Sequence, residues 1–455
     1  MNRTIPSLLP PRQLGRVRSS FYPSHISHRR FHRGFTHRLK YQFIEDVEPL
    51  WRYSPGGLHP VHIGDQFHNR YRVVDKLGFG DSSTVWLARD NKINQLVAIK
   101  IIDGSHKQKE ADILSALRNA TGRSENQRNS FFPPVLDRFE VRGVNGVHSC
   151  YVTEPAMINL ENFKGSPLYR FEMDVARVLV AQMVLSMAAM HSQGYVHGEN
   201  VLLRFPSSAF RDLSDQQFYD KYGEPSCEPI TPIEGAKRPP SLPSYGVVPA
   251  WLGCEKGKED RTVPVQDARI WIVDLGHSFA PPAEPECASG SIFEYCAPEF
   301  LFSPENSKVS FSSDIFSLGV CTWNLLSPCN LFTSFLGAGH EIMPDHVDLF
   351  GPSGMPSSWW DKWEGRSEYY TETRDLVPDY AEHVRSWDVK FKTLIQDARE
   401  EYGYPQISPE EKEAIYDTLR PMLALNPDDR CTAAQVLKSK WMTQWALPEY
   451  QKLKK

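Results

Sequence analysis

A glycine-containing turn and the lysine that follows it are the first residues whose types and spacing suggest chemistry. The turn covers residues 77–85, with the sequence LGFGDSSTV, between two segments rich in β-branched and aromatic residues. Gly78 and Gly80 carry no Cβ, so the backbone there can approach a phosphate group closely. The pattern is weak alone, because an ordinary hairpin turn has a similar composition and Ser83 stands where a third glycine is common.

Lys100 ends the segment Val97-Ala98-Ile99-Lys100, where it alternates with apolar residues on a predicted buried strand. Burying an ammonium group costs free energy unless its charge is matched. Phosphate oxygens and a carboxylate would match it. Glu110, on the predicted helix that follows, is the expected carboxylate, and Asp112 on the same helix is its rival.

A third feature is the apolar segment 270–273, which ends in Asp274-Leu275-Gly276. A carboxylate at the end of a strand, followed by a glycine turn, can face a cleft and bind Mg²⁺ through oxygen. A turn aspartate that binds nothing has the same local pattern, so the motif gains weight only from its context.

The elements that must position these residues change along the chain. Residues 71–102 predict three strands, a helical stretch follows, and residues 148–153 predict another strand, which together make a small β-rich lobe with one helix. From Met173 onward apolar residues recur at helical spacing, and polar interruptions favour a buried helix over a membrane span. Residues 206–265, rich in Pro, Ser, Gly and Asp, predict an insert with little fixed structure.

Length and composition limit the class of protein. A chain of 455 residues is too long for one ordinary core, so at least two lobes with extensions are expected. The formal net charge of −5 gives no nucleic-acid signature, and none of the eight cysteines forms a CxxC pair, which disfavours a disulfide framework or a zinc site. Before Glu45 there is no acidic residue but eight arginines, a composition similar to a mitochondrial transit peptide; a basic disordered tail is the alternative.

In this order and spacing, the three motifs resemble those of eukaryotic protein kinases. The resemblance implies an α+β, bilobal protein kinase fold. It implies an N-terminal extension over 1–44, a β-rich N-lobe with one helix over 45–156, and a larger, mainly helical C-lobe over 157–445 that contains the insert at about 206–265.

The same resemblance assigns roles to residues of this chain. It implies that Lys100 holds the α and β phosphates of ATP, that Glu110 pairs with Lys100, and that Asp274 binds Mg²⁺. The segment Glu154-Pro155-Ala156 resembles the hinge that hydrogen-bonds adenine. The implied ATP-binding residues are Leu77, Gly78, Phe79, Gly80, Asp81, Ser82, Ser83, Val85, Ala98, Lys100, Thr153, Glu154 and Ala156.

Motifs in the C-terminal half support the resemblance. Ala297-Pro298-Glu299 follows the metal aspartate, and residues 313–319 resemble the helix that anchors the large lobe. The family pairs the glutamate of the first motif with an arginine, for which Arg430 is the match. Breaking such a buried pair from one side costs about 3–5 kcal/mol.

Residues 56–65, GGLHPVHIGD, and residues 83–87 closely resemble the SR-protein kinases, which phosphorylate serines in Arg/Ser-rich proteins of RNA splicing. Those kinases carry a spacer between catalytic loop and metal aspartate, and the 74 positions between Asn200 and Asp274 match a shortened one. The resemblance implies ATP, Mg²⁺ and protein substrates, a monomer, no direct nucleic-acid contact, and a location in cytoplasm and nucleus, whereas the basic N-terminus indicates mitochondria. The acidic residues that would meet a basic substrate, if they are not simply a solvated helical face, are Asp375, Asp379, Glu382 and Asp388.

The catalytic loop departs from the family pattern. Kinases read His-x-Asp, four more residues and Asn, which supply a base for the substrate hydroxyl and a ligand for the second metal ion. This chain reads His197-Gly198-Glu199-Asn200 before the apolar residues 201–203, so four residues that would include the aspartate and a lysine are missing. His197 would organise the core of the loop.

Two alignments of this loop are open. In one, Asn200 is the metal ligand and the base is lost; in the other, Glu199 replaces the base and no asparagine follows at the right distance. The apolar residues 201–203 favour the first, and losing a general base costs roughly 10²–10⁴ in rate.

The gap has three explanations: a pseudokinase, a weak kinase that recruits Glu199, or an error at a predicted intron boundary, which the maintenance of every other motif favours. The leading interpretation is a serine/threonine kinase for Arg/Ser-rich proteins. The alternative is a nucleotide-binding pseudokinase that acts as a scaffold or docking module.

Overall fold

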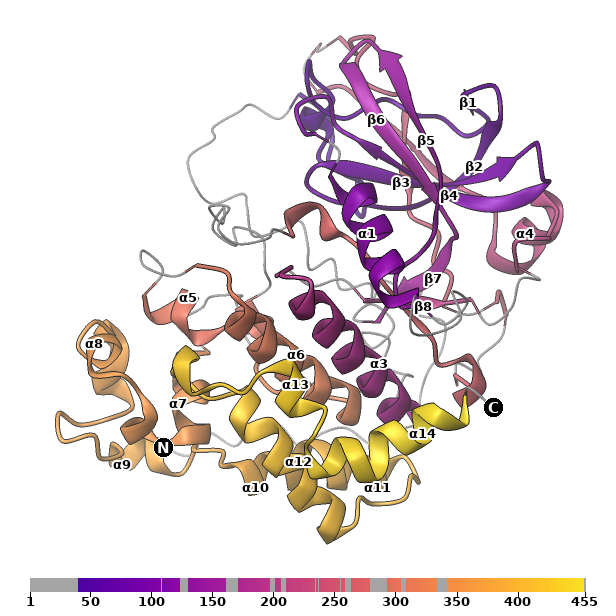
Figure 1. The fold of residues 1–455 in the computed structure, drawn as a ribbon. Coiled ribbons are helices and arrows are strands. Elements are labelled where there is room, and N and C mark those ends of the chain that lie inside the picture. The colour runs from indigo at the N-terminus through magenta and orange to yellow at the C-terminus, as the bar shows by residue number, and fades with distance from the viewer. Residues whose placement is uncertain are drawn as a thin grey trace.

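A β-rich N-lobe and a helical C-lobe make up the chain, as the computed structural model in Figure 1 shows. This confirms the predicted bilobal protein kinase fold. The described residues are 40–107, 109–122, 130–160, 171–196, 201–205, 210–233, 235, 237–253, 255–257, 263–278, 293–303, 308–333 and 342–453. Three predicted site residues, His197, Glu199 and Asn200, and nearly all of the predicted N-terminal extension lie outside them.

The N-lobe is an antiparallel sheet of six strands in the order β1-β2-β3-β4-β6-β5, with helix α1 beside it. Strand β4 is buried along almost its whole length, because the sheet is covered on both faces. Residues such as Val73, Trp86 and Ile99 form one apolar cluster, and α1 contributes Leu114 and Leu117 to the main core. The elements are β1 (Gln66–Phe67), β2 (Tyr71–Phe79), β3 (Ser83–Asp90), β4 (Gln95–Ile102), α1 (Glu110–Gly122), β5 (Val135–Gly143) and β6 (Gly146–Thr153).

The insert is ordered where the structure describes it, so the prediction of little fixed structure over 206–265 is wrong for these residues. It forms α4 (Asp215–Tyr222) and a hairpin of β9 (Ser226–Pro229) and β10 (Tyr245–Val248). Ser214 caps α4 in a capping box with Gln217, and Gly223 ends it with a positive φ of 102°, which favours glycine. Figure 1 shows α4 against the N-lobe sheet.

Apolar and charged contacts both attach the insert to the sheet. Three apolar residues of the insert pack against side chains of β2, β3 and β4: Phe210, Phe218 and Leu252. Asp215 accepts hydrogen bonds from Arg72 and Arg89 of the neighbouring strands. A composition typical of loops therefore still supplies enough aromatic surface to form a packed layer.

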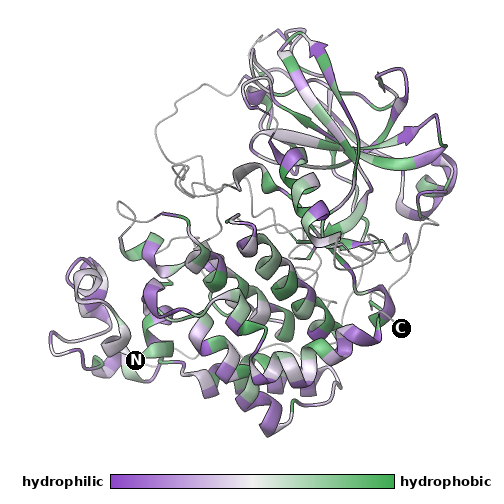
Figure 2. Cartoon of the chain, in the orientation of Figure 1, coloured by the Kyte–Doolittle hydropathy of each residue, from purple (hydrophilic) through white to green (hydrophobic). Residues whose placement is uncertain are grey.

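A small sheet in the order β11-β8-β7 connects the lobes, with β7 (Ala156–Asn159), β8 (Val201–Arg204) and β11 (Ile270–Ile272). Below it lie α3 (Met173–Ser192) and α6 (Phe311–Leu326), which Figure 2 shows as predominantly hydrophobic helices at the centre of the lobe. The other helices are α5 (Pro298–Phe302), α7 (Met343–Phe350), α8 (Ser357–Trp360), α9 (Pro378–Ala381), α10 (Trp387–Lys390), α11 (Asp397–Glu401), α12 (Pro409–Met422), α13 (Ala433–Val436) and α14 (Leu447–Lys452).

Among the described residues, α3 is the one helix long and apolar enough to pass a length-and-composition test for a membrane span. It packs against α6 and α14, and residues such as Val178, Leu179 and Val184 are fully buried among other side chains. The core helix of a globular lobe passes the same test. The burial of α3 agrees with the prediction of a buried helix from Met173 onward.

Candidate active site

Lys100 lies at the centre of the candidate site, between two carboxylates. Its Nζ on β4 is 2.6 Å from Oε2 of Glu110 on α1 and 2.9 Å from Oδ1 of Asp274, which follows β11. Burial by itself would lower the pKa of Lys100, but the interactions with Tyr151, Asp274 and Glu110 raise it well above the ordinary value. The lysine therefore stays charged. The rival carboxylate, Asp112, is exposed and pairs with Arg138 instead.

Glu110 also holds the turn that carries the predicted metal ligand. Its Oε1 accepts a hydrogen bond of 3.0 Å from the backbone N–H of Leu275. Asp274 itself has φ 62° and ψ 42°, a left-handed conformation that is uncommon outside glycine. Such conformations concentrate at functional sites, where the surroundings over-determine them. Helix α1, β4 and this turn thus form one connected unit.

The two glycines of the turn at residues 77–85 are not explained by packing among the described residues. Among the described residues, a Cβ added at Gly78 would meet no atom within 4 Å, and one added at Gly80 would meet only Ser83 Oγ, at 4.0 Å. Neither glycine has a positive φ. The backbone at these two glycines is therefore open to close approach by an external group.

Strand register brings the predicted nucleotide-binding residues to one region. Lys100 pairs with Val85 on β3 and with Tyr151 on β6, and Ala98 pairs with Thr153 at the end of β6. The turn 77–85 joins β2 to β3, so it lies at the end of the same strands. Glu154, next to Thr153 in the hinge segment, accepts a hydrogen bond of 3.0 Å from Arg211 of the insert.

Tyr151 is a member of this site that sequence reasoning missed. It is buried next to Lys100, and its pKa is raised well above the ordinary value, first by burial and also by a hydrogen bond to Glu110. The neutral phenol thereby encloses the ion pair from the β6 side. The available signal was the two-residue period of a strand, which puts Tyr151 on the same face as Thr153.

The ion pair predicted for the C-lobe is present. Arg430 donates two hydrogen bonds to Glu299, at 2.6 and 2.9 Å, and both residues are buried. Arg430 also donates to the carbonyls of Ala424 and Leu425. On the anchoring helix α6, Asp314 lies 3.0 Å from Nε2 of His191 at the end of α3.

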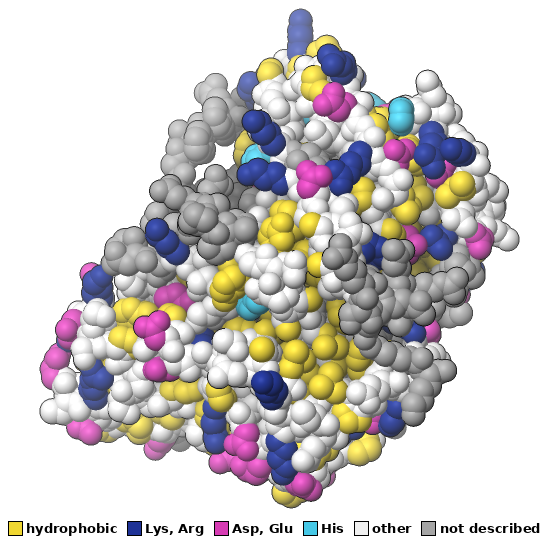
Figure 3. Space-filling model, in the orientation of Figure 1, with side chains coloured by type: hydrophobic (Ala, Val, Ile, Leu, Met, Phe, Trp, Pro, Cys, Tyr) yellow, Lys and Arg dark blue, Asp and Glu magenta, His cyan; other side chains and the backbone are white. Residues whose placement is uncertain are grey.

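The acidic residues proposed for substrate contact do not form one free patch. Asp388 is held by Lys412 at 2.5 Å, a hydrogen bond that lowers the pKa of its carboxyl. Asp375 accepts a hydrogen bond from Thr373 within a turn, whereas Asp379 and Glu382 stand on or next to α9. Figure 3 shows acidic side chains along the edge of the C-lobe near α8 and α9, with basic ones between them.

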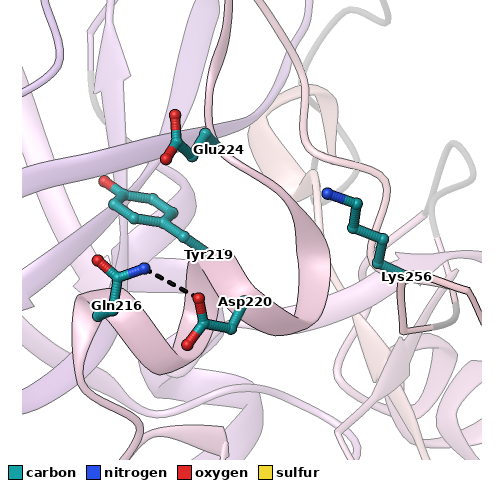
Figure 4. A pocket seen from close by; sticks show the side chains of 5 residues that line it. All are labelled: Gln216, Tyr219, Asp220, Glu224 and Lys256. Carbon is teal, nitrogen blue, oxygen red and sulfur yellow. Dashed lines mark hydrogen bonds between the residues drawn. The ribbon is translucent and has the colours of Figure 1, made fainter.

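A pocket on the insert lies outside the Lys100 cluster. Figure 4 shows its lining residues on and beside α4, where Nε2 of Gln216 donates to Asp220 at 2.9 Å. The lining residues are Gln216, Tyr219, Asp220, Glu224 and Lys256. They carry mixed charge and none belongs to a predicted site, so the pocket adds nothing to the chemistry described above.

Comparison with known proteins agrees with this geometry. The protein kinase domain family matches residues 263–442. The chain is 27% identical over 425 residues to serine/threonine-protein kinase SRPK of Physarum polycephalum, covering 88% of this chain and 92% of that protein. It is 24% identical over 415 residues to a serine/threonine protein kinase of Aspergillus fumigatus, covering 87% and 90%.

A shorter but closer match is human SRSF protein kinase 3, which is 33% identical over 180 residues, 37% of this chain and 32% of that protein. Together with the bilobal fold and the cluster around Lys100, these similarities show that the chain carries a protein kinase domain and is similar to the SR-protein-kinase-like serine/threonine kinases.

Proposed function

We propose that this protein transfers the γ-phosphoryl group of ATP to serine hydroxyls in Arg/Ser-rich protein segments. The observation that carries the proposal is the charged cluster of Lys100, Glu110 and Asp274 beside a turn whose glycines serve no internal contact. The name of the human relative, SRSF protein kinase 3, supports the choice of substrate.

The described residues fit a magnesium nucleotide. Lys100 would hold phosphate oxygens, Glu110 would keep Lys100 oriented, and Asp274 would bind the metal through a side chain that is 42% exposed. One or two carboxylates together with phosphate oxygens are the usual protein environment of Mg²⁺. Bound Mg²⁺ would neutralise charge on the phosphates.

In the proposed reaction the serine oxygen forms a bond to the γ-phosphorus, and the bond from that phosphorus to the bridging oxygen of ADP breaks. The shortened loop lacks the usual aspartate to take the serine proton, so the proton passes to solvent water. Strand register supports the alignment in which Asn200 is a metal ligand, because Val201, the next residue, pairs with Ile272, two positions before Asp274. Under that alignment transfer proceeds without a dedicated base.

The test is transfer of labelled γ-phosphate from ATP to an Arg/Ser-repeat peptide by the full chain, with Asp274→Asn as the inactive control. Labelled peptide that depends on Asp274 supports the proposal, and a matched peptide with alanine in place of serine must stay unlabelled. Absence of label with wild-type protein that binds ATP would contradict it. Asp379→Asn together with Glu382→Gln should raise the KM for the peptide if these acids meet the basic substrate.

The second candidate is a nucleotide-binding pseudokinase, favoured by the missing aspartate and lysine of the loop. ATP would then raise the melting temperature without any labelled product, and Lys100→Ala would abolish that stabilisation. Sequencing the transcript across codons 190–204 separates a true loss from a gene-prediction error. Cytoplasm and nucleus, or mitochondria, remain predictions to be tested by imaging the tagged full chain.

A further inference from the structure

Arg204, the last residue of β8, is a cation that the described part of the protein leaves without a partner for its charge. Its guanidinium stacks on the ring of Trp271 at 3.8 Å from the centroid, and makes no hydrogen bond or ion pair to any residue that the structure describes. The side chain is partly buried. A guanidinium has five N–H donors, and removing them from water costs free energy unless acceptors replace it.

Other arginines converge on the same place. The backbone N–H of Arg204 donates to the carbonyl of Arg269 at 2.8 Å, so these two residues are neighbours across β8 and the start of β11. Arg118 comes from the end of α1, and Arg211 from the start of the insert. Burial is the main cause that lowers the pKa of Arg204 to about 10. The like charges of Arg269, Arg118 and Arg211 lower this pKa further, whereas the negative charge of Glu154 raises it.

The carboxylates among the described residues do not balance this charge. Glu154 is hydrogen-bonded to Arg211, and Asp267 lies beside Arg269, whose charge acts on it. The guanidinium of Arg269 donates to the carbonyl of Leu453 at 3.3 Å, a contact that positions it without neutralising it. No described carboxylate forms an ion pair with Arg204, so a positive charge stays centred on its guanidinium.

We propose that Arg204 and Arg269 form the centre of a binding site for a phosphate-type oxyanion, with Arg118 at its edge. The planar guanidinium fork matches two oxygens of a phosphate, and stacking on Trp271 fixes its plane in advance. The ligand is either free phosphate or a phosphoserine side chain, since both present the same oxygens.

The site is separate from the nucleotide cluster but shares elements with it. Arg204 ends the strand that follows the catalytic loop, Arg269 precedes the strand that leads to Asp274, and Arg118 lies on the helix of Glu110. An oxyanion bound here would tie together three elements that carry the active site. The inference does not depend on whether this protein transfers phosphate.

The test measures binding of inorganic phosphate to the full chain carrying Lys100→Ala, which disables the nucleotide cluster. Thermal unfolding and calorimetric titration are run in phosphate and in chloride of equal ionic strength. We expect phosphate to raise the melting temperature more than chloride does. Adding Arg204→Gln should raise the dissociation constant for phosphate at least about tenfold, because one charge-assisted hydrogen bond is lost.

The matched control is Arg420→Gln, because Arg420 also stacks on an aromatic ring, at 4.8 Å from the centroid of Tyr416, but stands on α12 and not beside β8 or β11. It should leave phosphate binding unchanged. If Arg204→Gln fails to fold, Arg269→Gln takes its place. Equal stabilisation by chloride, or equal loss in the Arg420 variant, would overturn the proposal.

The source of the oxyanion is decided by titrating a phosphoserine peptide and its serine counterpart against the same variants. Tighter binding of the phosphopeptide than of phosphate, lost with Arg204→Gln, assigns the site to a phosphorylated segment. Equal affinity assigns it to free phosphate. Binding of the unphosphorylated peptide with the same affinity would overturn the assignment to an oxyanion.

Discussion

Glu110 contacts two different parts of the active site with its two oxygens, one on the Lys100 ammonium and one on the backbone of Leu275. Its side chain is 3% exposed. A buried carboxylate in this position keeps the lysine extended and fixes the turn that carries Asp274. The residue is therefore expected to influence nucleotide binding although it need not touch the nucleotide.

Glu110→Gln tests this at the residue level. The amide keeps the shape and an oxygen for Leu275 but removes the charge opposite Lys100, so ATP affinity should fall about 10–100-fold, the loss of a charge-assisted hydrogen bond. Fluorescent-nucleotide titration measures this without requiring turnover. Asp112→Asn, on the same helix and paired with Arg138 at the surface, should change little. Similar losses in both variants would contradict the assignment.

His346 is a second informative residue, because its burial makes the stability of the protein depend on pH. Both ring nitrogens are buried between the rings of Phe316 and Phe332, and neither has a hydrogen-bond partner among the described residues. Burial, with the charges of Lys390 and Arg430, lowers its pKa to about 3. The imidazole is therefore neutral in the folded state and becomes protonated only in the unfolded chain as the pH falls below its ordinary pKa.

His346→Phe should make the protein less sensitive to acid. Because the unfolded chain binds the extra proton, wild type loses stability as the pH drops from about 6.5 toward 3, by about 2 kcal/mol at pH 5. The variant has no imidazole at this position, so its free energy of unfolding does not fall for this reason. Urea unfolding at pH 7.5 and pH 5 measures it, with the exposed His383→Phe as control. A pH dependence that the His346 variant shares with wild type would count against this account.

Among the elements, the insert gives the clearest case of structure that local sequence does not reveal. Phe218 of helix α4 packs against apolar residues on strands that lie more than a hundred positions earlier in the chain. Asp215 lies at 2.7 Å from Arg89, whose side chain is 6% exposed. Removing the carboxylate would leave that buried guanidinium with two backbone carbonyls, of Asn94 and Leu213, but without a partner for its charge.

Asp215→Ala should therefore lower the free energy of unfolding by about 2 kcal/mol, between the values for an exposed and a buried ion pair. Urea denaturation measures the change. Asp220→Ala on the same helix is the matched control, since its carboxylate contacts Gln216 in an exposed hydrogen bond. An insert that is merely attached at the surface would give the same small effect for both variants.

The difference between the features that the sequence predicted and those that it missed has a physical cause. The contact of Lys100 with Glu110 was predictable because a buried charge needs a partner and few carboxylates were within reach. Glu299 and Arg430 were predictable through the family pattern alone. The insert and Tyr151 were not, because burial of an aromatic ring depends on which distant strand it meets. Long-range packing overrides local composition in such segments.

At the scale of the whole molecule, the fold fixes both ends of the catalytic loop. On one side α3 ends beside α6, where His191 contacts Asp314, and Val196 is buried. On the other side β8 begins at Val201, hydrogen-bonded between β7 and β11. Because each end is held by a different part of the core, a longer loop would have to extend outward rather than shift its anchors.

This arrangement predicts a gain of function. Inserting Asp-Leu-Lys-Pro between Gly198 and Glu199 restores the spacing from His197 to Asn200 and supplies a general base, so phosphoryl transfer should rise roughly 10²–10⁴-fold over the chain as it stands. Insertion of Asn-Leu-Lys-Pro, equal in length but without the carboxylate, is the control. Steady-state transfer of labelled phosphate to an Arg/Ser peptide measures both. A large gain from the aspartate insertion alone would mean that the binding machinery around Lys100 is competent and that the loop is what limits the rate. Equal rates for both insertions and the unaltered chain, with ATP still bound, would mean that the two lobes no longer form a catalytic site.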